Sequence, residues 1–571
     1  MNHMKTTRLF FLPFVLLLLS CASIQTTEQL KPPQAAIATA HPLATAAGME
    51  ILEKGGNAFD AAVAITAVIG VVEPYGSGLG GGGFWLLHRQ SDGKQVMVDG
   101  REKAPGEAFR DMYLDSNGNV REGASINGPL AAGIPGVPAA MAHIANKFGR
   151  LPLSISMQPA IDIARNGFEV DEQYRRYAKM RLDTLREFPS TASIFLVNNN
   201  VPPEGYLLKQ TDLANTLETI ANSGKEDFYR GKLANKLVAG VRESGGIWSL
   251  QDLKNYNIVE RKPIVANYHG MKIISASPPS SGGVALASMV NMLGQYDMNK
   301  YSEADKKHLT IEIMRRAYRD RAEYLGDTDF VDVPVNELTS TAHAKELVQS
   351  IKMDHATPSS ELKPVGNPTG SGSNTTHFSI LDKEGNRVAA TLSVNYLFGS
   401  CYVVPGTGFL LNDEMDDFSA KPGVPNAYGL VGAEANAIAP GKRMLSSMSP
   451  TFLEDDRGIA ILGTPGGSRI ITMLLIGLLE YEKGANAEQI VAKPRFHHQY
   501  LPDIVMFEQG AFSEDTEQEL NLRGHVLKKQ MSPYGGGFGH YGNMQAVVWD
   551  KKKNRVSAAS DKRGIGASSV R

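Results

Sequence analysis

Cysteine is scarce in this chain of 571 residues, which has only Cys21 and Cys401. If Cys21 is modified, as argued below, one thiol remains and no internal disulfide can form, so the core alone must hold the fold together. Cys401 lies beside Tyr402, with no histidine or asparagine pattern around it. It is therefore expected to be a packed small residue rather than a nucleophile.

An excess of charge is also lacking, since 58 Lys and Arg stand against 60 Asp and Glu, a net charge of −2. This balance gives no electrostatic reason to expect a nucleic-acid partner. The phosphate-binding loop G-x-x-x-x-G-K-[ST] and the zinc motif H-E-x-x-H are both missing from the sequence. The content of hydrophobic residues is 42%, which is enough for a sizeable core.

Two remaining patterns could suggest a cofactor or a metal, and neither does. Residues 78–83 read G-x-G-x-x-G, but a predicted helix precedes them and a predicted strand follows, the reverse of a dinucleotide fingerprint. The glycines are better explained by close approach of the backbone to other backbone or to a ligand. His497 and His498 are adjacent, so on a strand their rings point to opposite faces and make a poor chelate. We therefore expect no cofactor and no metal.

The N-terminus departs from the average composition. Lys5 and Arg8 precede the almost purely apolar run 9–20, which is shorter than the about 20 residues that span a membrane. Residues 1–20 thus predict an export signal, with a retained membrane anchor as the alternative. Leu18-Leu19-Ser20-Cys21 resembles the bacterial lipobox, which implies a periplasmic protein attached to the membrane through a lipid on Cys21. Residues 21–34 predict a tether.

Small and apolar residues at helical spacing over 41–72, interrupted by Gly55-Gly56, predict two helices, with Asn57 near the start of the second. Two strands are expected after the glycine run, at 84–88 and 95–99. Helical patterns recur over 150–245 and 300–327.

A change of texture marks the middle of the chain. Pro, Gly, Ser and Asn dominate from Pro358 to Asn374, which predicts an exposed segment that is easily cut. Immediately after it, residues 375–381 predict a strand, and residues 387–395 predict another. An exposed segment that ends directly before Thr375, the first residue of a predicted buried strand, indicates a boundary between two parts of the chain.

These two strands predict a hairpin with residues 383–385 as a three-residue loop, in which Gly385 takes the positive φ of a G1 bulge. Counting outward from this loop places Thr375 opposite Ser393, and Asn395 points to the same face. The three side chains would form one polar cluster. The alternative from spacing alone is an ordinary row of polar residues on a solvated strand.

An N-terminal threonine has chemistry that an internal one lacks. Its free α-amine, with a pKa of about 8, can take the proton of its own hydroxyl, so one residue supplies both nucleophile and base. Such a residue exists here only if the chain is cut between Asn374 and Thr375. The hydroxyl of Thr375 could make that cut by attacking the Asn374 carbonyl.

The sequence TTHFS at 375–379, with its continuation through 385–386, 391–395 and 398–399, resembles the signature of the γ-glutamyltransferases (γ-glutamyl transpeptidases). The resemblance extends over nearly all of the chain after the tether, in further blocks at 41–45, 55–62, 76–83, 101–105, 278–283, 324–327, 412–418, 445–450 and 463–468. Each block alone is weak evidence for the family, but the order and spacing of all the blocks together are specific to it.

The resemblance implies an α/β N-terminal-nucleophile hydrolase, a four-layer αββα sandwich. It implies synthesis as a proenzyme that cuts itself into a large subunit, here 35–374, and a small subunit, 375–571, which stay together and jointly form the fold. The implied substrates are glutathione and other γ-glutamyl compounds, with water, amino acids or peptides as acceptors.

The resemblance also implies roles for individual residues. Thr375 is the nucleophile, and Ser393 contacts its hydroxyl. Arg101 binds the α-carboxylate of the γ-glutamyl group, and Asp417 binds its α-amino group. Asn395 and Glu414 would assist Asp417 in binding the amino group, and Ser446 and Ser447 would also bind the carboxylate. The backbone N–H groups of Gly466 and Gly467 would form the oxyanion hole. Residues 422–443, with Tyr428, would form a lid over the pocket. Recognition of a zwitterion suggests a fixed cation and a fixed anion placed apart, which Arg101 and Asp417 would supply.

The sequence departs from the family pattern at two places. Ser393 stands where the family usually has threonine, so the hydroxyl remains while the methyl that fixes its rotamer is lost. We expect function to be retained with an altered rate of cleavage. Residues 561–564 read Asp-Lys-Arg-Gly where Asp-Pro-Arg is common, which puts little in doubt about the site.

Two alternative functions remain open from the sequence. A related acylase that removes glutaryl groups would share the chemistry but lack an anion for an α-amino group, and Asp417 argues against it. A non-catalytic periplasmic binding protein of the same fold would remain one full-length chain on a denaturing gel.

Overall fold

A computed structural model describes residues 30–362, 375–530 and 542–571. Pro32–Arg571 form one compact unit. The predicted export signal, the start of the tether, Cys21 and Asn374 lie outside the described residues. Among the helices that are described, none combines the length and the apolar character needed to cross a membrane.

The first of two large sheets contains strands from both sides of the predicted cut. Its seven strands, in spatial order, are β18 (Ala567–Val570), β1 (Ala36–Thr39), β9 (Thr376–Leu381), β10 (Arg387–Ser393), β2 (Gly82–Arg89), β3 (Lys94–Asp99) and β6 (Val259–Arg261). All neighbours in this sheet are antiparallel. The two strands predicted at 84–88 and 95–99 are confirmed as β2 and β3.

The second sheet is also shared between the two predicted subunits. Its six antiparallel strands are β17 (Arg555–Ser560), β16 (Gln545–Asp550), β12 (Gly458–Gly463), β11 (Thr451–Glu454), β8 (Met271–Ser275) and β7 (Ile264–Tyr268). The short strands outside the two large sheets are β4 (Phe168–Glu169), β5 (Leu207–Leu208), β13 (Phe496–His497), β14 (Val505–Phe507) and β15 (Leu527–Lys529).

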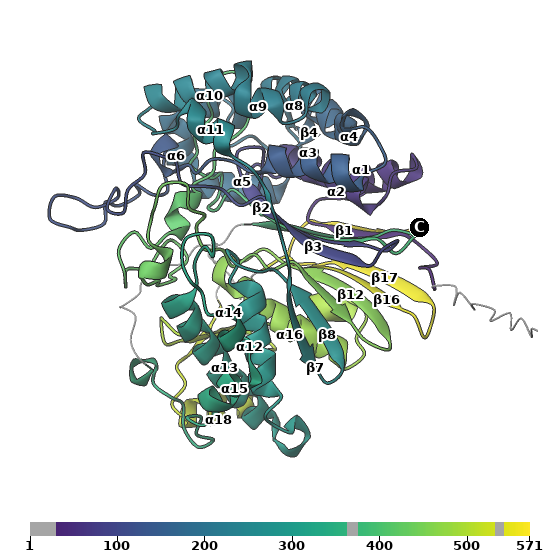
Figure 1. Cartoon of the computed structure of the whole chain (residues 1–571), viewed down its shortest axis with the longest axis vertical. Helices are drawn as coiled ribbons and strands as arrows, with labels where there is room; N and C mark the ends of the chain where they lie inside the picture. Colours follow the sequence, from purple (N-terminus) through teal and green to yellow (C-terminus); the bar gives the residue numbers. More distant parts are fainter. Residues whose placement is uncertain (1–29, 363–374, 531–541) are drawn as a thin grey trace, which may run out of the picture. The chain divides into compact units, whose positions relative to one another are not determined.

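Helices cover the outer face of each sheet, which gives the four layers visible in Figure 1. Strand β2 shows the alternation that this requires, because Trp85 and Leu87 belong to the core under the first helical layer while Phe84 and Leu86 belong to the core between the sheets. The first helical layer comprises α1 (Pro42–Glu53), α2 (Ala58–Val72), α3 (Val137–Phe148), α4 (Leu153–Asn166), α5 (Glu172–Met180), α6 (Leu182–Glu187), α7 (Pro189–Phe195), α8 (Thr211–Ser223), α9 (Glu226–Arg230), α10 (Lys232–Glu243) and α11 (Leu250–Asn255).

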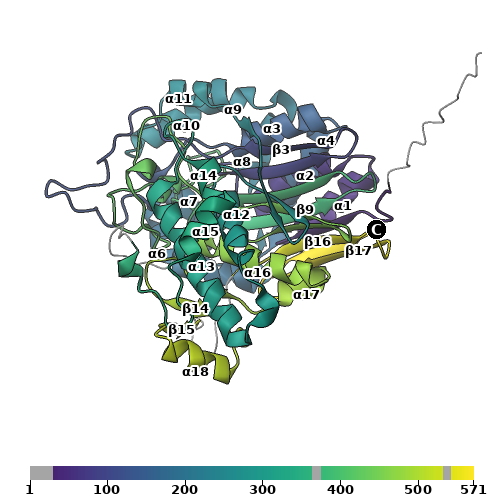
Figure 2. The ribbon, with the colours of Figure 1, turned by 60° about the horizontal axis from the view of Figure 1, so that its bottom comes forward.

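The second helical layer packs on the other sheet and comes forward in Figure 2. Its helices are α12 (Gly282–Leu293), α13 (Glu303–Tyr324), α14 (Val335–Leu338), α15 (Thr341–Val348), α16 (Ile470–Glu482), α17 (Ala487–Ala492) and α18 (Glu514–Leu522). The helical pattern over 300–327 thus corresponds to α13, whereas that over 150–245 is divided among seven shorter helices, α4 to α10.

The start of α2 explains why the predicted break at Gly55-Gly56 is correct. The Asn57 side chain accepts hydrogen bonds from the backbone N–H groups of Phe59 and Asp60, and the Asp60 carboxylate accepts one from the Asn57 N–H. This reciprocal capping box satisfies donors that a helix start would leave unpaired.

The hairpin that opens the predicted small subunit has the predicted register. Leu381 pairs with Arg387 and Thr376 with Leu392, and Gly385 has a φ of 96°. One step further along both strands, Thr375 comes opposite Ser393. The register follows from the loop, since a three-residue connection with a left-handed glycine fixes which residues face each other.

Glu73, at the C-terminal end of α2, makes the stability of the fold depend on pH. Its side chain is 2% exposed, and burial raises its pKa from 4.5 to about 7. A carboxyl whose pKa is raised on folding stabilises the fold fully below its unfolded pKa, and this contribution is lost as the pH rises through about 7.

We therefore expect the free energy of unfolding of the parent to fall by about 2–3 kcal/mol between pH 5 and pH 8 because of Glu73. Glu73→Gln should not show this fall. Urea unfolding midpoints at the two pH values measure this. Glu53→Gln, on the exposed end of α1, should leave the pH dependence of the parent unchanged. An identical pH dependence in Glu73→Gln and the parent would show that Glu73 is already ionised in the fold.

Candidate active site

Thr375 lies in a pocket that brings together nearly every residue predicted for the site. Thirteen other residues line this pocket: Arg101, Ser393, Asn395, Glu414, Asp417, Tyr428, Leu430, Ser446, Ser447, Met448, Gly467, Ser468 and Ile470. Gly466 directly precedes the lining residue Gly467. Four lining residues were not predicted for the site, Leu430, Met448, Ser468 and Ile470, although Met448 and Ser468 belong to two of the blocks that resemble the family.

Strand β9 begins and strand β10 ends at the pocket, which places the hydroxyl groups of Thr375 and Ser393 there. Thr375 is 8% exposed and Ser393 3%. The Ser393 hydroxyl accepts a hydrogen bond of 2.7 Å from the backbone N–H of Asn395, so the smaller side chain at this position is still held in place. Asn395 has a φ of 74°, and its amide donates to the Asp413 carbonyl at 3.0 Å. The predicted cluster of Thr375, Ser393 and Asn395 is confirmed.

The glycine run at 76–83 allows the backbone to pass close to the end of β10 and to the backbone at Leu410. A Cβ on Gly81 would lie 2.1 Å from the Ser393 carbonyl oxygen, and one on Gly80 would lie 2.0 Å from the Leu410 carbonyl oxygen. No side chain fits at such distances, so the expected close approach of backbone to backbone is confirmed.

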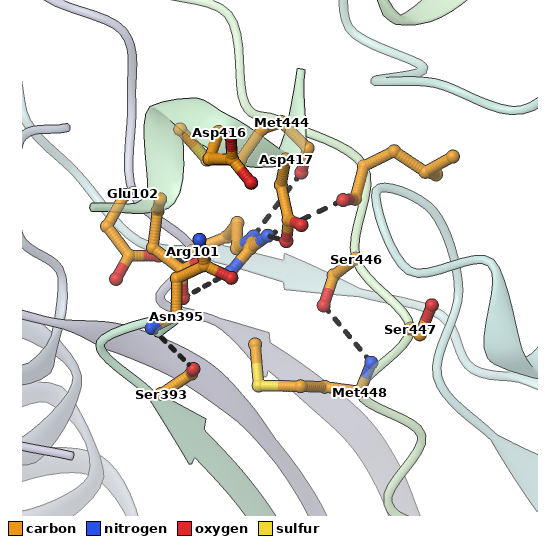
Figure 3. Close-up of polar contacts among 12 residues, drawn as sticks. Arg101, Glu102, Ser393, Asn395, Asp416, Asp417, Met444, Ser446, Ser447 and Met448 are labelled. Carbon is orange, nitrogen blue, oxygen red and sulfur yellow. Dashed lines mark hydrogen bonds and ion pairs between the residues drawn. The ribbon is translucent and has the colours of Figure 1, made fainter. Parts of the chain in front are cut away.

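Arg101 forms the charged centre of the pocket (Figure 3). Its Nη1 lies 2.8 Å from the Glu414 carboxylate and 3.5 Å from that of Glu102, and its Nη2 lies 2.5 Å from the Asp417 carboxylate. The guanidinium is 1% exposed. The expectation that the cation and the anion stand apart is therefore wrong, because Arg101 and Asp417 pair directly.

The direct pair has a simple physical cause. A guanidinium buried without a counterion would be costly, and the acidic side chains around Arg101 supply that counterion. A ligand carboxylate has to share or replace these contacts when it binds.

Burial raises the pKa of each of the three carboxyls around Arg101, namely Glu102, Glu414 and Asp417. Burial opposes the charge of Arg101, but the carboxylates of Glu414 and Asp417 outweigh it and raise the pKa of the guanidinium. The arginine is therefore a permanent cation, while the carboxyls around it can take up protons.

A short 3-10 helix, η4 (Glu414–Asp417), carries Glu414 and Asp417, whose carboxyls face Arg101. It also carries Asp416, whose carboxyl does not. Asp416 faces out of the pocket, where its carboxylate accepts hydrogen bonds from the Ser125 hydroxyl at 2.7 Å and the Ala427 N–H at 2.9 Å. Of the two adjacent aspartates, only Asp417 lines the pocket, as predicted.

Ser446 and Ser447 form the opposite wall. The Ser446 hydroxyl accepts from the Met448 N–H at 3.1 Å, and the Ser447 hydroxyl accepts from the Arg321 guanidinium at 3.1 Å. Among the described residues neither hydroxyl donates a hydrogen bond, so each can donate to a carboxylate.

Gly466 caps the 3-10 helix η6 (Gly467–Arg469), which leads into α16, and Gly467 is its first residue; their φ values are 142° and 57°. Within the described part of the chain, neither backbone N–H donates a hydrogen bond. Two backbone donors at the start of a helix are a typical arrangement for stabilising an oxyanion.

Tyr428 covers this turn. Its hydroxyl donates to the Asn395 carbonyl at 2.6 Å, and the residue is 6% exposed. A Cβ on Gly467 would lie 2.4 Å from the Tyr428 ring. Glycine at this position therefore lets the tyrosine pack directly against the predicted oxyanion hole.

Residues considered for other chemistry lie elsewhere. His497 contacts the Thr472 hydroxyl at 2.8 Å, whereas His498 contacts Asp503 at 3.1 Å. No group of His, Cys, Asp and Glu within the described ranges could hold a metal ion. Cys401 is fully buried, and burial raises its thiol pKa to about 12, so it is a packed residue as expected.

A family model described as gamma-glutamyltranspeptidase matches residues 44–570. This chain belongs to the γ-glutamyltranspeptidase family. The glutathione hydrolase proenzyme of Escherichia coli (strain K12) is 42% identical over 511 residues, which cover 88% of this chain and 87% of that protein.

Solved structures agree with this membership in the γ-glutamyltranspeptidase family. The cephalosporin acylase of Bacillus halodurans matches with a TM-score of 0.82 and 26% identity, over 95% of this chain and 96% of that chain. A γ-glutamyltranspeptidase chain of Helicobacter pylori matches with a TM-score of 0.55 and 41% identity, over 57% of this chain and 93% of that one. The predicted family and the αββα fold are confirmed.

Proposed function

We propose that this γ-glutamyltranspeptidase is an autoprocessed enzyme that takes the γ-glutamyl group from glutathione and related compounds and passes it to water or to amino acids and peptides. The observation that carries this proposal is the pocket itself, where Thr375 lies beside a buried Arg101, Asp417 and a pair of glycines at a helix start. Relatives named glutathione hydrolase proenzymes support the same reaction.

Maturation is the first reaction in this proposal. The Thr375 hydroxyl attacks the Asn374 carbonyl carbon, the bond to the Thr375 nitrogen breaks, and that nitrogen takes a proton to become a free α-amine. Water then hydrolyses the resulting ester and restores the hydroxyl. The fragments 35–374 and 375–571 remain together, because both sheets contain strands from each fragment.

Turnover uses the same hydroxyl with the new amine as base. The amine takes the hydroxyl proton as the oxygen attacks the γ-carbonyl, and the N–H groups of Gly466 and Gly467 stabilise the oxyanion. The amine then gives its proton to the leaving amino group of cysteinylglycine. Water or an acceptor amine attacks the γ-glutamyl ester in the second half, and no cofactor is required.

Recognition of the glutamyl end uses opposite charges on neighbouring residues. The α-carboxylate binds the Arg101 fork and the hydroxyls of Ser446 and Ser447, and the α-ammonium takes the place of Arg101 beside Asp417 and Glu414. A zwitterion thus adds one positive and one negative charge, each beside an opposite charge of the protein, and leaves the net charge of the pocket unchanged.

This exchange gives a test against the glutaryl acylase alternative. We expect a γ-glutamyl anilide to be turned over far better than a glutaryl anilide, which lacks the α-ammonium. Asp417→Asn should lower kcat/KM for the γ-glutamyl anilide by about 10- to 100-fold, because the α-ammonium loses its negatively charged partner, and should change the glutaryl reaction little. A parent preference for the glutaryl anilide would contradict the proposal.

We also propose that the mature protein is exported to the periplasm and attached to the membrane through a lipid on Cys21. The support is the sequence of residues 1–21 alone. Cys21→Ser should release the protein from the membrane fraction, whereas a membrane-bound variant would contradict the lipid anchor.

A further inference from the structure

Gln499, which follows strand β13, uses the full hydrogen-bonding capacity of its side-chain amide. Its Nε2 donates to the carbonyl oxygens of Gly429 and Leu501, both at 3.1 Å. Its Oε1 accepts from the Ser468 hydroxyl at 2.6 Å and lies 2.9 Å from Nε2 of His497. A primary amide has two donor hydrogens and two acceptor lone pairs, so all four positions are occupied.

The partners leave one orientation for this amide. A carbonyl oxygen only accepts hydrogen bonds, so the amide nitrogen must face Gly429 and Leu501, and the amide oxygen must face Ser468 and His497. His497 therefore carries its proton on Nε2, and its Nδ1 faces the Thr472 hydroxyl of α16 at 2.8 Å. The contact is specific in direction as well as in place.

The first partner belongs to a tight turn, residues 426–430, which we name the Tyr428 turn. The Asn426 side chain accepts hydrogen bonds from the N–H groups of Tyr428 and Leu430 at 3.0 and 3.1 Å. The Gly429 N–H donates to the Asn426 carbonyl at 2.9 Å. These local bonds close the turn on itself, so it moves as one unit.

Besides the bond from the Ala427 N–H to Asp416, three hydrogen bonds that involve side chains connect this unit to neighbouring segments. Asn426 donates to Asp417 at 3.1 Å, and the Tyr428 hydroxyl donates to the Asn395 carbonyl. The third is the hydrogen bond from Gln499 to Gly429. The first two reach residues proposed to bind the substrate amino group, and the third, like the packing of the Tyr428 ring on Gly467, lies toward the oxyanion side of the pocket.

The second partner, Ser468, belongs to the turn 466–469, which we name the oxyanion turn. Its carbonyl accepts a hydrogen bond from the Tyr318 hydroxyl of α13, while its own hydroxyl is held by Gln499. The Tyr428 ring packs on Gly467 in the same turn. Gln499 thus bridges two turns that already touch at the pocket.

We propose that Gln499 is a positioning residue that couples the Tyr428 turn to the oxyanion turn. When the Tyr428 turn covers the pocket, the oxyanion donors are then also held in place. This role deepens the proposed γ-glutamyl transfer and rests on it for its effect on catalysis. Gln499 does not line the pocket, so it acts through the residues that it holds.

Hydrogen–deuterium exchange on the cut, two-fragment protein tests the coupling without any substrate. Gln499→Leu keeps much of the volume and removes all four hydrogen bonds, so backbone amides in both turns should exchange about tenfold faster. Gln251→Leu, on the exposed side of α11, should change neither turn. Faster exchange in one turn only, or in neither, would overturn the coupling.

Gln499→Glu separates the two halves of the bridge. A carboxylate still accepts from Ser468 and His497 but has no hydrogen for Gly429 and Leu501. We expect the Tyr428 turn to exchange faster than in the parent, with a smaller change in the oxyanion turn than in Gln499→Leu. An equal response of both turns to the two variants would show that Gln499 acts only as general packing.

Kinetics then links the coupling to the reaction. Both variants should still be cut before Thr375 and should lose about 10- to 100-fold in kcat/KM for a γ-glutamyl anilide, with a lower kcat as well as a higher KM. Unchanged kinetics in Gln499→Leu would overturn the positioning role. A parent protein that turns over no γ-glutamyl compound would instead overturn the proposed function, and the exchange measurements would still decide the coupling.

Discussion

Replacing Thr375 by alanine is expected to abolish both the cut and the turnover. The hydroxyl is the attacking atom in maturation and in catalysis, so its loss removes two reactions at once. We expect Thr375→Ala to remain one chain on a denaturing gel and to lose more than about 10³-fold in kcat for a γ-glutamyl anilide, the scale found when a nucleophile is removed.

Thr375→Ser and Thr376→Ser are matched controls for this loss. Thr375→Ser keeps an N-terminal hydroxyl and should be cut and active, with altered rates. Thr376→Ser trims the next residue of the same hairpin, whose side chain alternates to the other face of the sheet, and should be cut and active. A Thr375→Ala protein that is still divided at this bond would show that another group makes the cut.

Replacing Arg101 is expected to have the second largest effect, through binding rather than through the chemical step. Arg101→Leu removes the guanidinium proposed to bind the ligand carboxylate and takes from Glu102, Glu414 and Asp417 the cation at their centre. Losing one partner of a buried charge pair costs about 2–5 kcal/mol. KM for the γ-glutamyl anilide should rise about 100-fold or more.

Arg101→Lys tests whether charge alone is enough. Lysine keeps the cation but lacks the planar fork that contacts two carboxylates at once, so KM should rise less than in Arg101→Leu and still clearly exceed the parent value. Arg110→Leu removes an exposed arginine paired with Glu434 and should leave KM unchanged. A parent-like KM in Arg101→Leu would remove this residue from substrate binding.

Local features of the fold were predictable because short segments determine them. The β9–β10 register follows from a three-residue loop with Gly385 at its bulge, and the start of α2 follows from Asn57 and Asp60 three residues apart. The order of the family blocks then predicted which residues meet in the pocket, a set that no local pattern connects.

Contacts between distant segments could not be read from the sequence. Arg101 and Asp417 are 316 positions apart, and their pairing depends on where η4 lies in the fold. The bridging role of Gln499 depends on two partners that lie 70 and 31 positions away, Gly429 and Ser468, although its other two partners are near in the sequence. The packing of Tyr428 on Gly467 is likewise visible only once a Cβ position can be compared with the ring.

The most direct test of the central claim is the N-terminal sequence of the smaller fragment of the purified protein. If Thr375 is released as the nucleophile, this fragment begins Thr375-Thr376-His377. A single uncut chain in a preparation that hydrolyses γ-glutamyl compounds, or a fragment that begins at any other residue, would contradict the claim.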